Sequence, residues 1–111
     1  MHELDTDLAQ DAAVIRVDTR LTMVNAPDLR AAVAEALDAG RTTVIVDLGR
    51  CEFMDSSGLG AIIGGLKVAR QAGGDLRIAA VQPQVKMVLQ LTSMDKVLTS
   101  YGSAEEAFSN D

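Results

Sequence analysis

The segment from Phe53 to Gly60 carries the residues best suited to chemistry. It reads Phe-Met-Asp-Ser-Ser-Gly-Leu-Gly, so the hydroxyls of Ser56 and Ser57 directly follow the carboxylate of Asp55. A serine at the start of a helix can cap it. A phosphate on such a serine would meet free backbone N–H groups and the positive end of the helix dipole, although Asp55 would repel it. The motif therefore has two interpretations: a helix cap provided by Ser57 or Ser56, or a serine that is modified.

Catalysis by these serines lacks the groups that it needs. A nucleophilic serine requires an adjacent base, and the sole histidine of the chain is His2, near the N-terminus. No Gly-x-Ser-x-Gly elbow is present. The run from Gly58 begins like a dinucleotide-binding fingerprint, but its third glycine would fall at Ile63. We therefore expect no catalytic residue and no cofactor. One Cys and one His are also too few for a structural zinc site, so we expect no metal.

Glycines inside the helix predicted after the motif need an explanation, because each costs about 1 kcal/mol relative to alanine. Gly60 and Gly64 are four residues apart and share one face. Either Gly64 or Gly65 lets this helix pack closely on a neighbour, or the strip is a docking face for a protein beside Ser56. The residues that we assign to such a partner-binding surface are Met54, Gly60, Ala61, Gly64, Lys67 and Val68.

Composition limits the remaining function classes. The chain has 111 residues, of which 48% are hydrophobic, 23% charged and 3% aromatic, and its net charge is −6. This size and composition predict one domain with an aliphatic core. The acidic balance disfavours nucleic-acid binding, which rests on many lysines and arginines. Cys51 has no partner for an intrachain disulfide and is expected to be buried. With an acidic N-terminus and no apolar run of about 20 residues, we expect a cytoplasmic protein with no membrane span.

Strands and helices are predicted to alternate along the chain. Period-two or β-branched runs predict strands over 12–19, 42–48, 76–80 and 97–101. The first expected helix is capped by Asn25, has Pro27 in its first turn and ends at Gly40. The second runs from near Ser57 to Gly73-Gly74, and the third is opened by Pro83. A last helical turn is expected over 103–108, capped by Ser103. The expected core positions of the second helix are Leu59, Ile62, Ile63 and Leu66, and those of the third are Val85, Val88, Leu89 and Leu91. The first strand has one polar face, so we expect an α/β domain with a mixed, mostly parallel sheet and helices mainly on one face.

From about residue 10 to 108, the chain resembles the STAS domain family, and more closely the bacterial anti-sigma factor antagonists. The segments that carry the resemblance are Val44–Leu48, Phe53–Gly60, Gly73–Leu76 and Pro83–Val85. The resemblance implies one STAS-like domain over 1–111 and a regulatory role. It also implies binding to an anti-sigma factor that is a serine kinase, which frees the sigma factor. The kinase would phosphorylate Ser56 and so end the complex, and a serine phosphatase would reverse this.

Within this resemblance, Ser57 would remain the helix cap, and Gly58 completes the motif. Thr22 stands where the family usually carries an aspartate, and Ser93 stands where it often carries a glycine. These departures affect partner contacts and a helix end, respectively. Two other STAS roles stay open, namely a subunit of a lipid- or anion-transport assembly that docks on an ATPase, and a scaffold in a sensory complex.

Overall fold

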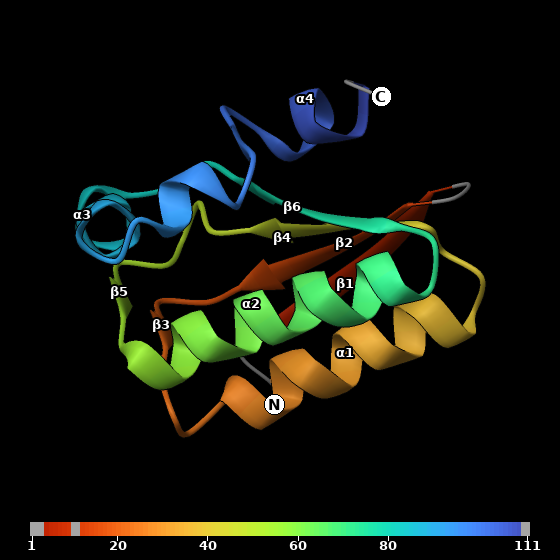
Figure 1. The fold of residues 1–111 in the computed structure, drawn as a ribbon, viewed down its shortest axis with the longest axis horizontal. Coiled ribbons are helices and arrows are strands. Elements are labelled where there is room, and N and C mark those ends of the chain that lie inside the picture. Colours follow the sequence, from red (N-terminus) through yellow and green to blue (C-terminus); the bar gives the residue numbers. More distant parts are fainter. Residues whose placement is uncertain (1–3, 10–11, 110–111) are drawn as a thin grey trace.

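A mixed five-stranded sheet lies at the centre of the computed structural model, which describes residues 4–9 and 12–109 (Figure 1). The strands are β1 (Leu4–Ala9), β2 (Ala12–Val17), β3 (Arg20–Leu21), β4 (Thr43–Asp47), β5 (Phe53–Met54), β6 (Asp75–Ala79) and β7 (Ser100–Tyr101). The helices are α1 (Ala26–Asp38), α2 (Ser56–Gln71), α3 (Pro83–Leu91), the 3-10 turn η1 (Met94–Lys96) and α4 (Ala104–Ser109). None of these helices is long and apolar enough to span a membrane.

The strand order of the main sheet is β1-β2-β4-β6-β7. Its first pair, β1 with β2, is antiparallel, and the other three pairs are parallel. The short strands β3 and β5 form a separate parallel pair beside it. Parallel neighbours require crossovers, and α1 and α2 supply the first two. The expectation of a mixed, mostly parallel sheet is therefore confirmed.

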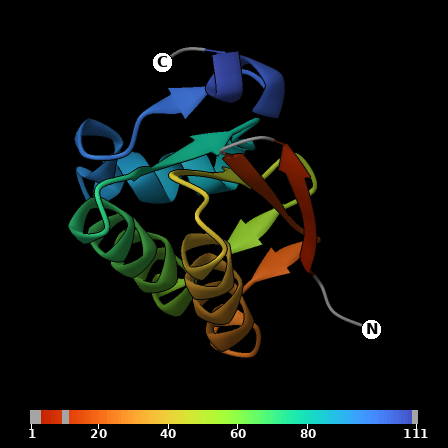
Figure 2. The ribbon, with the colours of Figure 1, turned by 90° about the vertical axis from the view of Figure 1, so that its right-hand side faces the viewer.

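Helices α1 and α2 lie side by side against one face of the sheet, and α4 lies on the opposite face (Figures 1 and 2). Helix α3 belongs to the α1–α2 side, because its Val85 and Leu89 are buried in the same cluster as Leu29 of α1 and Ile62 of α2. The core is aliphatic, as the scarcity of aromatic residues predicts. The helices thus gather mainly on one face, which positions the starts of α1 and α2 at the same end of the sheet.

The opposite face of the sheet is more buried than its sequence predicts. Ile45 and Ala79 are fully buried there against Ala107 of α4, and Val14 packs on them. The expectation of a wet face on the first strand is therefore corrected, since Val14 and Arg16 are half-buried. The short C-terminal helix, whose start Ser103 caps by accepting from the Glu106 N–H as predicted, accounts for this burial.

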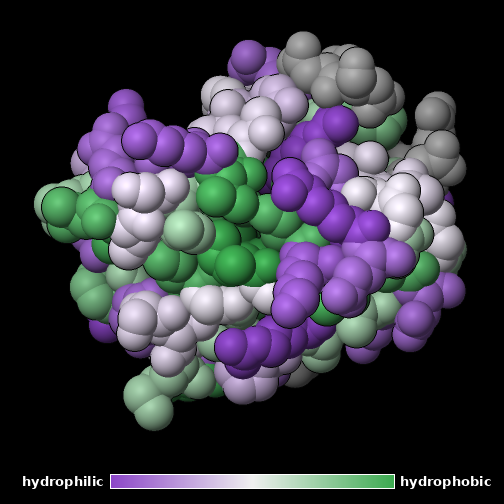
Figure 3. Space-filling model, in the orientation of Figure 1, coloured by the Kyte–Doolittle hydropathy of each residue, from purple (hydrophilic) through white to green (hydrophobic). Residues whose placement is uncertain are grey.

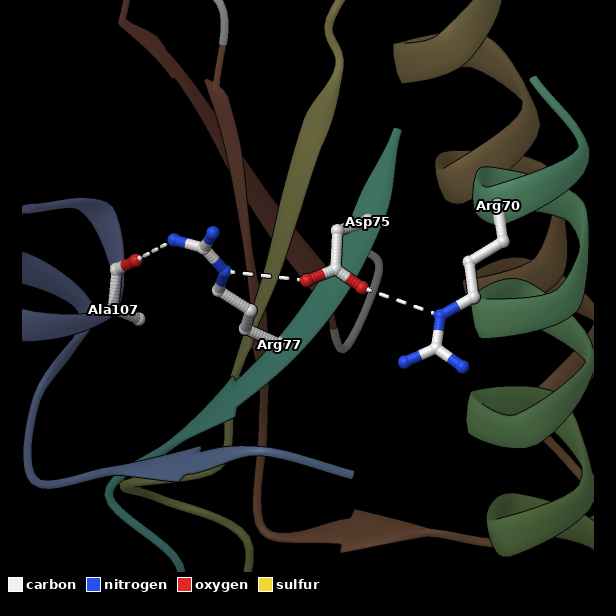
Figure 4. Close-up of polar contacts among 4 residues, drawn as sticks. All are labelled: Arg70, Asp75, Arg77 and Ala107. Atoms are coloured by element: carbon white, nitrogen blue, oxygen red, sulfur yellow. Dashed lines mark hydrogen bonds and ion pairs between the residues drawn. The ribbon is translucent and has the colours of Figure 1, made fainter. Parts of the chain in front are cut away.

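An ion-pair chain joins the two helical layers across β6 (Figure 4). Asp75 forms an ion pair with Arg70 of α2 at 3.6 Å and accepts a hydrogen bond from the Nε–H of Arg77 at 3.4 Å. The guanidinium of Arg77 also donates to the carbonyl of Ala107 in α4 at 2.6 Å. Arg77 has a side chain 12% exposed, so its charge is largely withdrawn from water and matched by these partners. This series of contacts links the C-terminal end of α2, through β6, to α4.

The start of α1 and the end of α3 differ from what their sequence signals predict. Asn25 stands at the N-cap position of α1, but its side chain accepts from the Thr22 N–H and donates to the Arg20 carbonyl instead of capping the helix. Ser93 follows α3 with φ of 60°, the left-handed conformation that a glycine usually takes. The turn after α3 is therefore kept although its glycine is absent. Leu91 of α3 was predicted to be core and is 78% exposed.

Candidate functional site

Ser56 is the first residue of α2, and its side chain is exposed. A single residue, Asp55, separates it from β5. The Ser56 hydroxyl forms no hydrogen bond with any residue that the structure describes. A reactive group from another protein can therefore approach this oxygen without displacing an internal contact.

Asp55, and not Ser57, caps α2. Its Oδ1 accepts from the Gly58 N–H at 2.8 Å, three residues along, which is the spacing of an N-cap bond. Its Oδ2 accepts from the N–H of Met23 at 3.2 Å, in the loop before α1. The half-buried Ser57 makes no side-chain hydrogen bond among the described residues. The expectation that Ser57 caps the helix is wrong, because the carboxylate one residue before Ser56 occupies that role.

Gly58 allows the start of α2 to approach β3. A Cβ at this position would collide with the backbone carbonyl oxygen of Leu21 and would lie 2.8 Å from the Leu21 Cγ. A backbone atom cannot move aside as a flexible side chain can, so only glycine fits here. The glycine of the motif therefore fixes where Ser56 emerges from the fold.

Two exposed apolar side chains stand in the loop beside Ser56. Met23 is 73% exposed and Val24 is 80% exposed. The loop is fixed by the bonds of Asn25, which is 2% exposed, and by Thr22, whose hydroxyl oxygen accepts from the Val24 N–H. Thr22 thus serves the loop turn at the position where the family pattern has an acid.

Phe53 of β5 adds a third apolar group near the serine. It is 36% exposed, and the guanidinium of Arg20 lies 4.7 Å from its ring centre. We call Met23, Val24, Phe53 and Ser56 the serine face. Sequence reasoning did not assign Met23 or Val24 to the site. The available signal was two consecutive large apolar residues in a loop, because adjacent exposed apolar side chains can form an interaction patch.

Two residues of the predicted partner-binding surface are buried. Met54 is 1% exposed, and the Gln84 side chain holds both its N–H, at 2.9 Å, and its carbonyl, at 3.2 Å. Ala61 is 0% exposed. A partner cannot touch either side chain, so both are removed from the surface. Their burial follows from the inward face of α2 and from the anchoring of β5 on α3.

The core face of α2 is built mainly from its small residues. The buried positions are Gly58, Ala61, Ile62, Gly65, Leu66 and Ala69. Leu59 and Ile63, predicted as core, are half-buried at its edge. A Cβ on Gly65 would lie 3.0 Å from Leu76 and 3.4 Å from Val33, so this glycine serves close packing. Of the two interpretations of the glycines, the packing one holds for Gly65.

Gly64 instead opens onto a hollow between α1 and α2. Nothing lies within 4 Å of the position that its Cβ would take. The hollow measures about 170 Å³ and is lined by Arg30, Val33, Ala34, Gly64, Gly65 and Val68. Gly60 is exposed one turn before Gly64, and Val68 is 47% exposed one turn after it. The strip of Gly60, Gly64 and Val68 is therefore continuous with Ser56 along one face of α2.

Lys67 is three residues after Gly64 and lies beside the glycine strip on α2, but it faces a different hollow. It borders a second hollow of about 440 Å³ whose apolar residues are Ile63, Leu66 and Val97. Figure 3 shows an apolar area bordered by hydrophilic side chains on the face that carries this hollow. Lys67 and Gly64 thus do not line the same depression.

Beneath the site, Cys51 is 0% exposed, and its thiol donates to the Phe53 carbonyl at 3.3 Å. Burial raises the pKa of the Cys51 thiol above its ordinary value. The predicted small hydrophobic role of this residue agrees with its place in the core. Within the described residues, no three or more metal-ligating side chains gather at one place.

Comparison with known proteins assigns the fold to a family. The STAS domain family matches residues 3–107. An anti-sigma F factor antagonist from Paenibacillus polymyxa is 26% identical over 106 residues, covering 95% of this chain and 91% of the relative. The crystal structure of a putative anti-sigma factor antagonist from Thermotoga maritima superposes with a TM-score of 0.87 at 26% identity, covering 96% of this chain and 92% of that one.

The anti-sigma factor antagonist SpoIIAA in its unphosphorylated form gives a TM-score of 0.81 at 26% identity, with 95% and 92% of the two chains covered. SpoIIAA of Bacillus has also been solved in a phosphorylated form. The family match over most of the chain leads to one conclusion: this chain belongs to the STAS domain family, and its structural neighbours include anti-sigma factor antagonists.

Proposed function

We propose that this chain is an anti-sigma factor antagonist that works by partner switching. Its unphosphorylated form binds a cognate anti-sigma factor with serine kinase activity and thereby frees a sigma factor. Phosphorylation of Ser56 by that kinase ends the complex, and a serine phosphatase restores the binding form. We place these events in the cytoplasm and assign the chain no catalytic step of its own. Relatives named as anti-sigma factor antagonists support this proposal.

The observation that carries the proposal is that Ser56 is exposed within the serine face and that its hydroxyl forms no hydrogen bond to the described part of the chain. A protein that covers Met23 and Val24 would bury two large apolar side chains, each contributing about 1.5–3 kcal/mol when fully covered. The same protein would enclose Ser56, because Met23 is tied to Asp55 at the start of α2. A kinase that binds here therefore has its substrate oxygen inside the contact area.

Phosphorylation would weaken this contact through charge. The phosphate adds about −1.5 to −2 charges. It would stand next to Asp55, whose two carboxylate oxygens already accept from Gly58 and Met23. Enclosing that extra charge in an apolar contact requires desolvation. A loss of about 3 kcal/mol would weaken binding more than a hundredfold.

The proposed partner surface combines the serine face with the exposed strip along α2. Its members from the sequence prediction are Gly60, Gly64 and Val68, and Lys67 lies at its far border. Because the glycines have no side chains, a partner helix or loop could lie close to the backbone of α2. Met54 and Ala61 are excluded from this surface because they are buried.

The test is phosphorylation by candidate anti-sigma kinases from the same genome, with ATP, followed by intact mass measurement and site mapping. We expect one phosphate on the wild-type chain and on Ser57→Ala, and none on Ser56→Ala. The matched serine control separates a specific site from general loss of substrate quality. Phosphate on Ser57 in the wild-type chain, or binding and phosphorylation by none of the kinases, would contradict the proposal.

A further inference from the structure

Arg30 of α1 lies over the face of α2 that carries Ser56. Its Nη2 is 4.0 Å from the position that a Cβ on Gly60 would take. Ser56 stands four residues before Gly60, so the two positions are neighbours on one face, with Cβ atoms about 5–6 Å apart. The Cβ direction in a helix also leans towards the N-terminus, that is, from Gly60 towards Ser56. The guanidinium is therefore about one helical turn from the Ser56 hydroxyl.

Arg30 has no competing partner among the residues that the structure describes. It is exposed, and across residues 4–9 and 12–109 it forms no ion pair or hydrogen bond. The absence of a side chain on Gly60 leaves space for the guanidinium above the α2 backbone. Its long stem lets it shift by a few ångström, and its planar fork of donors matches the oxygens of a phosphate.

We propose that Arg30 receives the phosphate of phosphorylated Ser56 and holds it over Gly60. This inference rests on the proposed function, since it requires Ser56 to be the modified residue. Arg30 is then a positioning residue, which turns the modified side chain along the strip instead of leaving it in solvent. The modification would cover the start of the Gly60–Gly64 strip as well as add charge, so one phosphate would alter two parts of the proposed partner surface.

Other charged side chains near Ser56 also shift the second pKa of the phosphate, and they stay the same in every variant that we compare below. Asp55, directly before Ser56, raises the second pKa of the phosphate, which is ordinarily about 6. Arg20 lies over Phe53 and acts in the opposite direction. Against this background, an exposed arginine–phosphate pair is expected to lower that pKa by about 0.5 units.

The test measures the second pKa of the phosphate by phosphorus NMR on protein with phosphoserine incorporated at position 56 during translation. This preparation needs no kinase or partner, so failure of the proposed function and failure of this inference are separable. The variants are Arg30→Gln, the conservative Arg30→Lys, and Lys67→Gln as the matched charge control. Lys67 is about 16 Å further along the helix axis, beyond the screening length at 0.15 M salt.

We expect the pKa to rise by about 0.5 units in Arg30→Gln, to return part of the way in Arg30→Lys, and to stay unchanged in Lys67→Gln. Circular dichroism of each variant shows whether the fold is retained. An Arg30→Gln pKa equal to that of the wild-type chain would overturn the inference. So would equal rises in Arg30→Gln and Lys67→Gln, because these would reflect net charge alone.

Discussion

The carboxylate of Asp55 is expected to hold two segments together, and its removal should affect both. Asp55→Ala deletes the cap bond to the Gly58 N–H and the bond to the Met23 N–H. A lost cap costs about 1 kcal/mol. A second hydrogen bond of this kind contributes about 0.5–1.5 kcal/mol. The substitution should therefore lower the free energy of unfolding by about 2 kcal/mol.

Urea unfolding measures this loss, and Ser57→Ala is the matched control. Ser57 lies two residues away and has no side-chain hydrogen bond in the described structure, so its removal should change the free energy of unfolding by less than about 0.5 kcal/mol. Asp55→Asn should recover the cap part of the Asp55→Ala loss, about 1 kcal/mol, but not the rest, because its single amide oxygen can accept from the Gly58 N–H while its NH2 group cannot accept from the Met23 N–H.

Hydrogen exchange locates the effect. The amides of Gly58 and Met23 should both exchange faster in Asp55→Ala, although they are 35 residues apart in sequence. The reasoning would be refuted if Ser57→Ala lost as much stability as Asp55→Ala, or if Gly58 were affected and Met23 were not.

Four further substitutions or reagents test the packing around the site. Gly58→Ala should destabilise the fold by about 1–3 kcal/mol, because its Cβ would meet the Leu21 backbone. Gly64→Ala should stabilise the fold by about 0.5–1 kcal/mol, because its Cβ would have free space. Urea unfolding measures both changes, and equal effects would contradict the different packing of the two glycines. Burial raises the pKa of the Cys51 thiol and shields it from solvent. Cys51 should therefore react with iodoacetamide at pH 8 far more slowly in the folded than in the unfolded chain, and equal rates would show that the thiol is accessible. Arg77→Met should speed amide exchange in α4 about tenfold and leave the first turns of α2 unchanged, since it removes the bond to Ala107; unchanged exchange in α4 would contradict that anchoring role.

The helices and central strands were predictable because their signals are local. Pro27 and Pro83 open α1 and α3, Gly40 takes φ of 86° after α1, and β-branched residues fill β4. Strand β1 was missed because its six residues include two aspartates and it pairs on one side alone, with β2. Strands β3 and β5 are two residues long, which is too short for any periodicity to show.

The position of Ser56 was predictable from the motif, whereas the helix cap and the full core face of α2 were not. The motif indicated an exposed Ser56 at the start of α2, and the structure places it there. The cap was assigned to the wrong residue because Asp and Ser cap equally well, and only the position of the helix start distinguishes them. The core face of α2 was predicted correctly at Ile62 and Leu66. Its small members Ala61 and Gly65 were not assigned to the core, because hydrophobicity favours Leu59 and Ile63 while close packing selects small residues. Met23 joins the serine face through a contact with Asp55 that spans 32 residues, which no local pattern reports.

The most direct test of partner switching compares two affinities of one anti-sigma kinase. The dissociation constant is measured by titration calorimetry for the unmodified chain and for the chain with phosphoserine at position 56. We predict at least a hundredfold weaker binding of the phosphorylated chain, which corresponds to about 3 kcal/mol. Equal dissociation constants would contradict the account, because a phosphate inside the contact area cannot leave the binding free energy unchanged.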